Sequence, residues 1–353
     1  MPELTAQFET AFQNIEPTVG DKENAPLAHA AVSEALAGDS VIADWGFKPL
    51  LIGSYKRHVS IRRVKDVDVF GRLTDLEDGV KPGALLTEFE RVLKKEFPAV
   101  GDQLRVRRQA RSLQVEFSEY NGLYVDAVPA RPWISPTGVD AWQLPKREER
   151  DDEQGWQATN PHELTELTTA LNGVDQFDGH YVRTVKLLRQ TRRSLMGNKK
   201  PGGLTIEIAA LHAFSSGLVH GPTHADYYVT ALRETGNVLR NAFVLGLGLG
   251  LDDPTLPGEK VVIRGDDETK RELAHAFLEA ATRAEDALGK RSDEKCAAAK
   301  VFRDLLGKAV DDVGDTDFVF PMPDVCNADG TAKRFSTVTA GDPVVPAGDR
   351  RFG

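Results

Sequence analysis

A short apolar run that ends at Gly53-Ser54, followed twelve residues later by Asp66-x-Asp68, constrains this chain more than any other feature. Side chains alternate between the two faces of a β-strand, so in a strand both aspartates project to the same side. Two carboxylates held side by side repel each other unless a cation lies between them. Mg²⁺ suits this spacing, because it commonly takes one or two carboxylates together with substrate phosphates.

The residues around this pair indicate phosphate chemistry. A glycine such as Gly53 lets the backbone approach a phosphate closely, and free N–H groups at the start of a helix attract anions. A third carboxylate, Asp126, lies in the otherwise apolar segment LYVDAV, where a lone buried charge is costly unless it is paired or bound to a metal. Each piece alone has an ordinary explanation: a solvated strand face, a plain helix cap or an edge-strand charge. Three carboxylates on neighbouring strands facing a phosphate-binding turn, however, form the arrangement that two-metal phosphoryl transfer needs.

Hydrophobic periodicity predicts an α+β front half and a helical back half. Helices are expected in roughly the first 45 residues, over residues 84–97, and through most of residues 162–310. Short strands are expected over residues 67–73, 103–108, 112–117 and 123–128. Residues 130–161, which contain prolines and the charged run KREERDDE, are predicted to form a long irregular connection. We therefore predict a core with N-terminal helices over residues 1–150, a helical domain over 151–310 and a flexible tail over 311–353.

Composition excludes several classes of protein. The 353 residues carry 44 Lys and Arg against 54 Asp and Glu, a net charge of −10, so there is no strong case for a nucleic-acid partner. The apolar runs fall far short of the ~20 residues that a membrane span needs, and the N-terminus does not resemble a signal peptide. Cys296 and Cys326 cannot form a disulfide framework or a four-ligand zinc site. We expect a cytoplasmic protein with no membrane partner.

Two basic stretches contain no acidic residue. Residues 54–65 hold five Lys or Arg, and residues 179–206 hold seven, Lys186 and Arg189 among them. Such segments can line a cleft that receives triphosphates. The alternative is a solvated helix face, which we expect for about half of these residues. Binding of an RNA or a peptide activator is a further alternative that the sequence leaves open.

The chain resembles the DNA polymerase β-type nucleotidyltransferases in Gly53-Ser54, Asp66-x-Asp68 and Asp126. More narrowly, it resembles the bacterial CD-NTases, relatives of cyclic GMP-AMP synthase and oligoadenylate synthase that act in CBASS antiphage defence. The narrower resemblance covers roughly residues 40–310. It rests on VDAVPA followed by GWQATNP, the helix YVRTVKLLRQTRR, the segment LTIEIAALHAF with its Glu207, the loop LDDPTLPG and the closing helix AAAKVFRDLLGKAV.

This resemblance implies a nucleotidyltransferase core and a helical domain with the active site between them. The implied activity is synthesis of a cyclic di- or trinucleotide from ATP and other nucleoside triphosphates. It further implies that Asp66 and Asp68 hold two Mg²⁺ ions, with Mn²⁺ as an alternative metal. Asp126 completes the site of one ion and helps to deprotonate the attacking hydroxyl. Ser54 and the adjoining N–H groups would hold the β- and γ-phosphates.

Two positions depart from the family pattern. The family helix usually has a Lys and an aromatic residue where this chain has Arg189 and Thr191, and Lys186 lies one turn before Arg189. Either Lys186 or Arg189 could contact the triphosphate. Residue 203, where the family commonly has a polar side chain that contacts phosphate, is Gly203.

The tail and the competing functions lead to further hypotheses. In some CBASS systems an E1/E2-like enzyme joins the CD-NTase C-terminus to target proteins, and Gly353 is the corresponding candidate here. An effector protein would be reached only through the diffusible product. The competing functions are a nucleotidyltransferase that modifies tRNA or protein, and a non-catalytic nucleotide- or RNA-binding module on the same fold.

Overall fold

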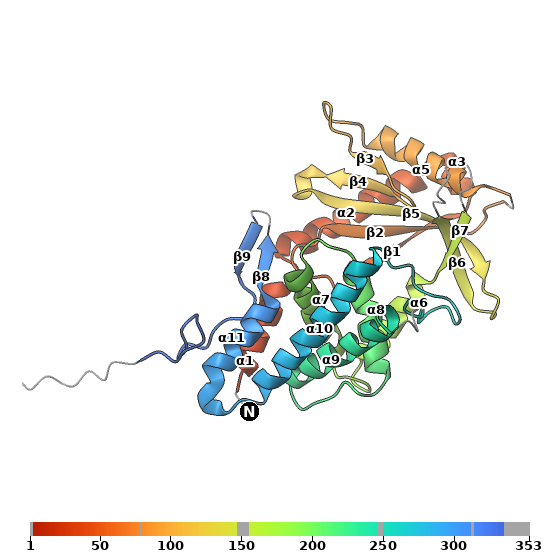
Figure 1. Ribbon diagram of the computed structural model, residues 1–353. Coiled ribbons are helices and arrows are strands. Elements are labelled where there is room, and N and C mark those ends of the chain that lie inside the picture. The colour runs from red at the N-terminus through yellow and green to blue at the C-terminus, as the bar shows by residue number, and fades with distance from the viewer. Residues whose placement is uncertain (1–2, 78, 147–154, 246–249, 312–313, 335–353) are drawn as a thin grey trace, which may run out of the picture.

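The computed structural model describes residues 3–77, 79–146, 155–245, 250–311 and 314–334 (Figure 1). A twisted mixed sheet lies on one side of the molecule and a bundle of helices on the other. Buried apolar side chains form two clusters, one between the sheet and its own helices and one within the bundle. No helix in the described ranges is long and apolar enough to cross a membrane.

The central sheet has the strand order β1-β2-β5-β4-β3, and β2 runs parallel to β5 while its pairing with β1 is antiparallel. Strand β5 continues past the central sheet and pairs with β6, which pairs with β7. The strands are β1 (Phe47–Ile52), β2 (Asp66–Leu73), β3 (Val106–Arg108), β4 (Leu113–Phe117), β5 (Leu123–Ile134), β6 (Asp140–Lys146) and β7 (Gly155–Thr159). The alternation of buried and exposed residues along β2 and β4 matches the sequence pattern that predicts them.

Two helices cover the sheet. Helix α2 (Val19–Ala37) begins at a capping box in which Thr18 and Asp21 bond each other's backbone N–H groups. Helix α5 (Pro82–Glu96) has a proline in its first turn, where no backbone donor is lost. Both contribute apolar residues to the cluster that includes Val67 and Val69 of β2. These valines anchor one face of β2, so its aspartates project from the other.

The helical bundle forms the second half of the protein. Its helices are α6 (Pro161–Asn172), α7 (His180–Met196), α8 (Gly203–Ser215), α9 (His224–Phe243), α10 (Asp267–Leu288) and α11 (Lys295–Leu306). The N-terminal helix α1 (Thr5–Ile15) packs into this bundle rather than against the sheet, since Phe8, Phe12 and Ile15 belong to the bundle's apolar cluster. The short helices α3 (Ser40–Asp44) and α4 (Gly53–Lys56) flank β1. The predicted sheet-plus-helices fold is confirmed.

The predicted irregular connection over residues 130–161 is wrong. Strand β5 extends to Ile134, and β6 and β7 complete an antiparallel extension of the sheet. Prolines obscure this pattern in the sequence, yet they are tolerated because the extension lies beyond the central sheet, where fewer backbone N–H groups need partners. Pro132 pairs with Trp142, and Pro145 with Trp156. Most of the charged run lies outside the described residues.

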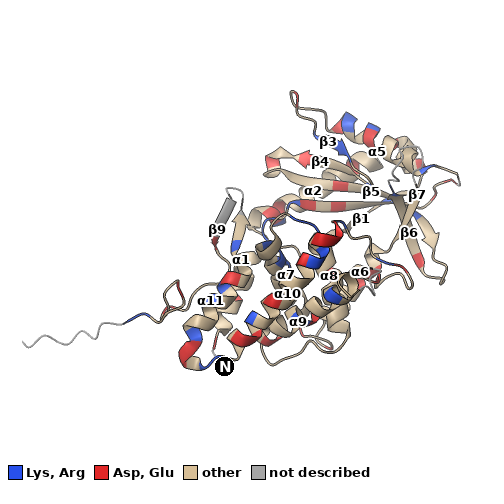
Figure 2. Cartoon of the chain, in the orientation of Figure 1, with Lys and Arg blue, Asp and Glu red and all other residues tan. Residues whose placement is uncertain are grey.

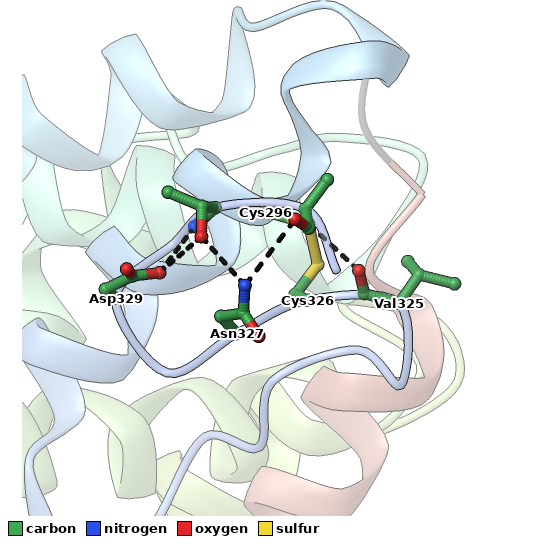
Figure 3. Close-up of a disulfide and its surroundings, with 7 residues drawn as sticks. Cys296, Val325, Cys326, Asn327 and Asp329 are labelled. Carbon is green, nitrogen blue, oxygen red and sulfur yellow. Dashed lines mark hydrogen bonds between the residues drawn. A yellow bond between two sulfur atoms is a disulfide. The ribbon is translucent and has the colours of Figure 1, made fainter. Parts of the chain in front are cut away.

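The flexible tail expected from residue 311 is also wrong for the described residues 314–334. Strand β9 (Gly314–Phe318) pairs with β8 (Lys308–Asp311), and the next residues, Val319 and Phe320, are fully buried in the bundle's cluster. Cys326 forms a disulfide with Cys296 at the start of α11 (Figure 3). The two cysteines therefore form one cross-link, which no pattern in the sequence predicts.

Candidate active site

Strands β2 and β5 bring the three predicted carboxylates together. In the parallel pairing of these strands, Asp68 lies directly opposite Asp126, and Asp66 lies two residues before Asp68 on the same face. In Figure 2 acidic segments interrupt β2 and β5, and basic segments of α7 lie below them. The sequence predicts three carboxylates on neighbouring strands, and the structure places them so.

The proximity of these groups changes their protonation. Burial, followed by the negative charges of Asp66 and Asp126, raises the pKa of Asp68 to about 7, although nearby Arg57 opposes the shift. Burial and the charge of Asp66 likewise raise the pKa of Asp126 to about 6. Within the described part of the chain, Asp126 Oδ1 is buried and has no hydrogen-bond partner. The site therefore holds excess negative charge that a cation would relieve.

The Gly53-Ser54 turn lies against these carboxylates. Ile52 at the end of β1 pairs with Asp68, and Gly53 then turns with φ = +81° to begin α4. A Cβ at this position would overlap Asp68 Oδ2, so the turn requires a glycine both for its backbone conformation and for space. Ser54 Oγ lies 3.0 Å from Ser60 Oγ. The backbone N–H groups of Val59 and Ser60 donate hydrogen bonds to the Ser54 carbonyl.

Two cavities open beside the carboxylates, one on each side of the Gly53-Ser54 turn: Gly53 lines the first and Ser54 lines the second. One, of about 470 Å³, is lined by Gly53 and Asp68 and by apolar groups that include Trp156, Leu204 and Val261. The other, of about 240 Å³, is lined by Ser54 and Asp66 and by a set of basic side chains. That basic set comprises Arg63, Lys65, Arg189, Arg192 and Arg193. A cavity with an apolar wall next to a cationic cavity suits a ligand with a flat ring system and a polyanionic tail.

Comparison with known proteins finds a matching domain and a related enzyme. Residues 3–172 match the model of the Second Messenger Oligonucleotide or Dinucleotide Synthetase domain. The cyclic AMP-AMP-AMP synthase of Acinetobacter sp. is 25% identical over 316 residues, which cover 85% of this chain and 83% of that protein. Residues 3–172 of the chain thus carry the synthetase domain of the CD-NTases.

Solved CD-NTase structures share the fold. Escherichia coli CdnC with ATP matches 87% of this chain and 98% of its own with a TM-score of 0.63 and 16% identity. The complex of CdnC with HORMA-deltaN matches 86% and 97% with a TM-score of 0.64 and 18% identity. Bradyrhizobium diazoefficiens CdnG in complex with GTP matches 85% and 97% with a TM-score of 0.62 and 15% identity. These structures show the shared fold, while the domain match and the Acinetobacter relative indicate a nucleotidyltransferase of the cyclic oligonucleotide synthase class, as predicted.

The choice between Lys186 and Arg189 depends on which cavity each side chain lines. Lys186 is buried against α1, where its ammonium group pairs with Glu16. Arg189 lines the smaller cavity together with Ser54 and Asp66. Although the two residues are one turn apart on α7, Arg189 is therefore the better candidate for a phosphate contact in this CD-NTase.

Other residues of the basic stretch 179–206 mainly stabilise the fold. Arg183 pairs with Glu9 of α1 at 3.0 Å, and Lys199 pairs with Glu272 of α10 at 2.7 Å. Arg192 donates hydrogen bonds to the carbonyl oxygens of residues 197, 199 and 201, and so holds the loop before α8. The solvated helix face that we expected for about half of these residues does not describe Arg192, which is buried.

Sequence reasoning missed several charged neighbours of the CD-NTase site. Arg57 of the turn forms a buried ion pair with Glu207 of α8, across 150 residues of sequence. Its one signal in the sequence is a Glu inside an otherwise apolar helical segment. The charge of Arg264 opposes the rise in the pKa of Asp126. Arg111 lines the larger cavity, and its own burial, followed by the charge of Arg264, lowers its pKa. Neither residue follows a pattern that the sequence alone reveals.

Proposed function

We propose that this CD-NTase synthesises a cyclic di- or trinucleotide second messenger from ATP and other nucleoside triphosphates, with Mg²⁺ as its metal, in antiphage defence. The observation that carries the proposal is the pairing of Asp68 with Asp126 across β2 and β5, beside Asp66 and the Gly53-Ser54 turn. The ATP and GTP complexes of the related structures, and the named product of the Acinetobacter relative, support the choice of substrate.

In the proposed reaction, the 3′- or 2′-hydroxyl of one nucleotide attacks the α-phosphate of a second nucleoside triphosphate. Pyrophosphate leaves, and repetition closes the ring. Ser54 and Arg189 would bind the phosphates from the smaller cavity, and the apolar wall around Trp156 would hold a base. Asp126, with its pKa raised to about 6, would accept the proton of the attacking hydroxyl. Catalysis of this kind depends mainly on positioning and charge stabilisation.

The carboxylates fit Mg²⁺ as donors, with Mn²⁺ as an alternative. All are oxygen ligands, and the raised pKa values of Asp68 and Asp126 and the unpartnered Asp126 Oδ1 indicate a charge excess that a divalent cation would relieve. Among the described residues, no three metal-ligating side chains already converge as a cage. In the proposal, Asp66, Asp68 and Asp126 would hold the ion together with substrate phosphates, which supply the remaining ligands. When bound, the metal neutralises charge on the reacting phosphate.

Incubation of the purified protein with labelled nucleoside triphosphates and Mg²⁺, but no macromolecule, tests the function. Small products that resist phosphatase support cyclic synthesis. Label that appears on tRNA or protein, when these are added, would favour the transferase alternative. Binding of nucleotide without any product would favour the non-catalytic alternative.

A double variant tests the site. Asp66→Ala with Asp68→Ala should abolish the product, while circular dichroism and the melting temperature show a folded protein. Glu116→Ala offers a matched control, since this acidic residue of β4 lies on the same sheet and outside both cavities. Unchanged synthesis in the double variant would contradict the assignment of these carboxylates.

We also propose that an E1/E2-like enzyme joins the carboxylate of Gly353 to target proteins. Gly353 lies outside the described residues, and the support comes from the resemblance to CBASS systems and from the glycine itself. Removal of Arg351–Gly353 should abolish covalent conjugates in cells and leave nucleotide synthesis intact. Conjugates that persist would contradict this part of the proposal.

A further inference from the structure

A buried carboxylate joins the two halves of the protein beneath the proposed phosphate site. Glu207 lies in α8 between apolar residues, and its side chain is 1% exposed. It accepts hydrogen bonds from Arg57 Nε and Nη2 and, at 3.3 Å, from Arg189 Nη1. Arg57 ends the helix that Gly53 begins, and Arg189 projects from α7. One carboxylate thus fixes both a residue of the phosphate-binding turn and the cation opposite it.

The charges of this cluster do not balance among its three members. Two guanidinium groups share one carboxylate, and buried unpaired charge is costly. In the part of the chain that the structure describes, Arg189 Nε is buried and has no hydrogen-bond partner. Arg189 also lines the cavity that contains Ser54 and Asp66. The remaining donor capacity of the cluster is therefore available at the place where a triphosphate would lie.

Gly203 provides the space that Arg189 occupies. A Cβ at residue 203 would lie 2.9 Å from Arg189 Cζ and 2.9 Å from its Nη2, closer than real Cβ contacts. The neighbouring Gly202 has no atom within 4 Å of its own Cβ position. The two departures of this chain from the family pattern, an arginine at 189 and a glycine at 203, are therefore in contact. The guanidinium group fills the volume that a side chain at residue 203 would take.

We propose that Glu207 is a positioning residue, which fixes the Gly53-Ser54 turn through Arg57 and aligns Arg189 on the triphosphate in the smaller cavity, and that Gly203 is the space this alignment requires. The inference deepens the proposed function and rests on it for the identity of the nucleotide. It assigns Glu207 no contact with substrate. Its effect is on the affinity for the phosphate chain, transmitted through the two arginines.

Inorganic tripolyphosphate and adenosine separate the phosphate site from the base site. Their dissociation constants are measured by calorimetry on the full chain at fixed free Mg²⁺. Glu207→Gln should raise the tripolyphosphate Kd at least tenfold and leave the adenosine Kd within twofold. Arg57→Met with Glu207→Leu replaces the buried pair with apolar groups, a change that commonly preserves folding. It should keep the wild-type melting temperature and still show the tenfold loss.

A wild-type tripolyphosphate Kd in a folded form of either variant would overturn the proposal, because a merely structural ion pair predicts that result. Should wild-type protein make no cyclic product yet show these losses of affinity, the proposed function fails and the positioning role stands. Should the wild type make the product while the variants keep its affinity, the positioning role fails and the proposed function stands.

Two adjacent glycines provide an independent test that leaves the ion pair intact. Gly203→Ala should raise the tripolyphosphate Kd about tenfold, and the matched control Gly202→Ala should leave it within twofold. Arg189→Lys should recover most of the loss in a Gly203→Ala background, because the slimmer side chain fits beside a methyl group. The contact between Gly203 and Arg189 would be contradicted by losses of tripolyphosphate affinity that simply add when Gly203→Ala and Arg189→Lys are combined. Equal losses of affinity for Gly202→Ala and Gly203→Ala would contradict it as well. This test decides the proposal even where the Glu207 variants do not fold.

Discussion

Substitution of Asp68 by Asn should stabilise the metal-free protein while it destroys activity. The unfolded chain releases the Asp68 proton near its ordinary pKa of 3.8, whereas the folded protein keeps it up to about pH 7. The folded state therefore binds more protons than the unfolded state between these values, and the free energy of unfolding falls as the pH rises. Above pH 7 the full loss is present, and at about 1.36 kcal/mol for each pH unit it amounts to roughly 4 kcal/mol. An amide at this position escapes that loss.

Urea denaturation in the presence of a chelator measures the effect. The gain in unfolding free energy of Asp68→Asn over wild type should grow from about 1–2 kcal/mol at pH 5 to roughly 4 kcal/mol at pH 8. Added Mg²⁺ should stabilise wild type and narrow the difference, because a cation offsets the same repulsion. A gain that is equal at both pH values, or a variant less stable than wild type at pH 8, would refute the electrostatic reasoning.

Other substitutions distinguish roles that the structure assigns. Gly53→Ala should lower kcat at least 100-fold for a stability cost of about 1–3 kcal/mol, since it adds strain at a left-handed position against a carboxylate; steady-state kinetics and denaturation measure the two effects. Lys186→Ala should change the KM for ATP less than twofold, whereas Arg189→Ala should raise it tenfold or more; equal effects would contradict the cavity assignment. Cys296→Ser should lower the unfolding free energy of the oxidised protein by about 3–4 kcal/mol, and a thiol reductant should abolish this difference. If Cys296→Ser leaves the unfolding free energy of the oxidised protein unchanged, the Cys296–Cys326 bond does not restrain the unfolded chain.

The features predicted well from the sequence are those that depend on near neighbours along the chain. The alternation in β2 predicts which face carries Asp66 and Asp68, and the Gly53 turn follows from adjacent residues. The fold and family follow from several such local patterns in order. The residues predict that Asp126 lies on a strand next to the aspartate pair, but the register that puts it opposite Asp68 was not predicted, because strand pairing is not encoded in either strand alone.

The features that escaped prediction depend on contacts between distant segments. No periodicity links Arg57 to Glu207, and the charge of Arg264 reaches Asp126 only because a loop of the helical half returns to the sheet. Lys186 and Arg189 lie one turn apart on nearly the same face of α7, so the sequence does not show which of them reaches the phosphate site. The structure distinguishes them, because Lys186 pairs with Glu16 whereas Arg189 lines the smaller cavity. The roles of the site residues remain predictions that the experiments above test.

The contact between the two ends of the described chain bears on when the protein can fold. Asn14 of α1 donates a hydrogen bond to the carbonyl of Val319, 305 residues later, and the Phe8 ring meets the Phe320 ring at 5.1 Å between centroids. Domains generally fold as the ribosome releases them, from the N-terminus onward. Helix α1 cannot complete its packing until Phe320 has emerged, although the sheet that carries the three aspartates can form much earlier. A nascent chain would thus hold the sheet with the three aspartates before its helical half is complete, and we expect no nucleotide synthesis until Phe320 has left the ribosome.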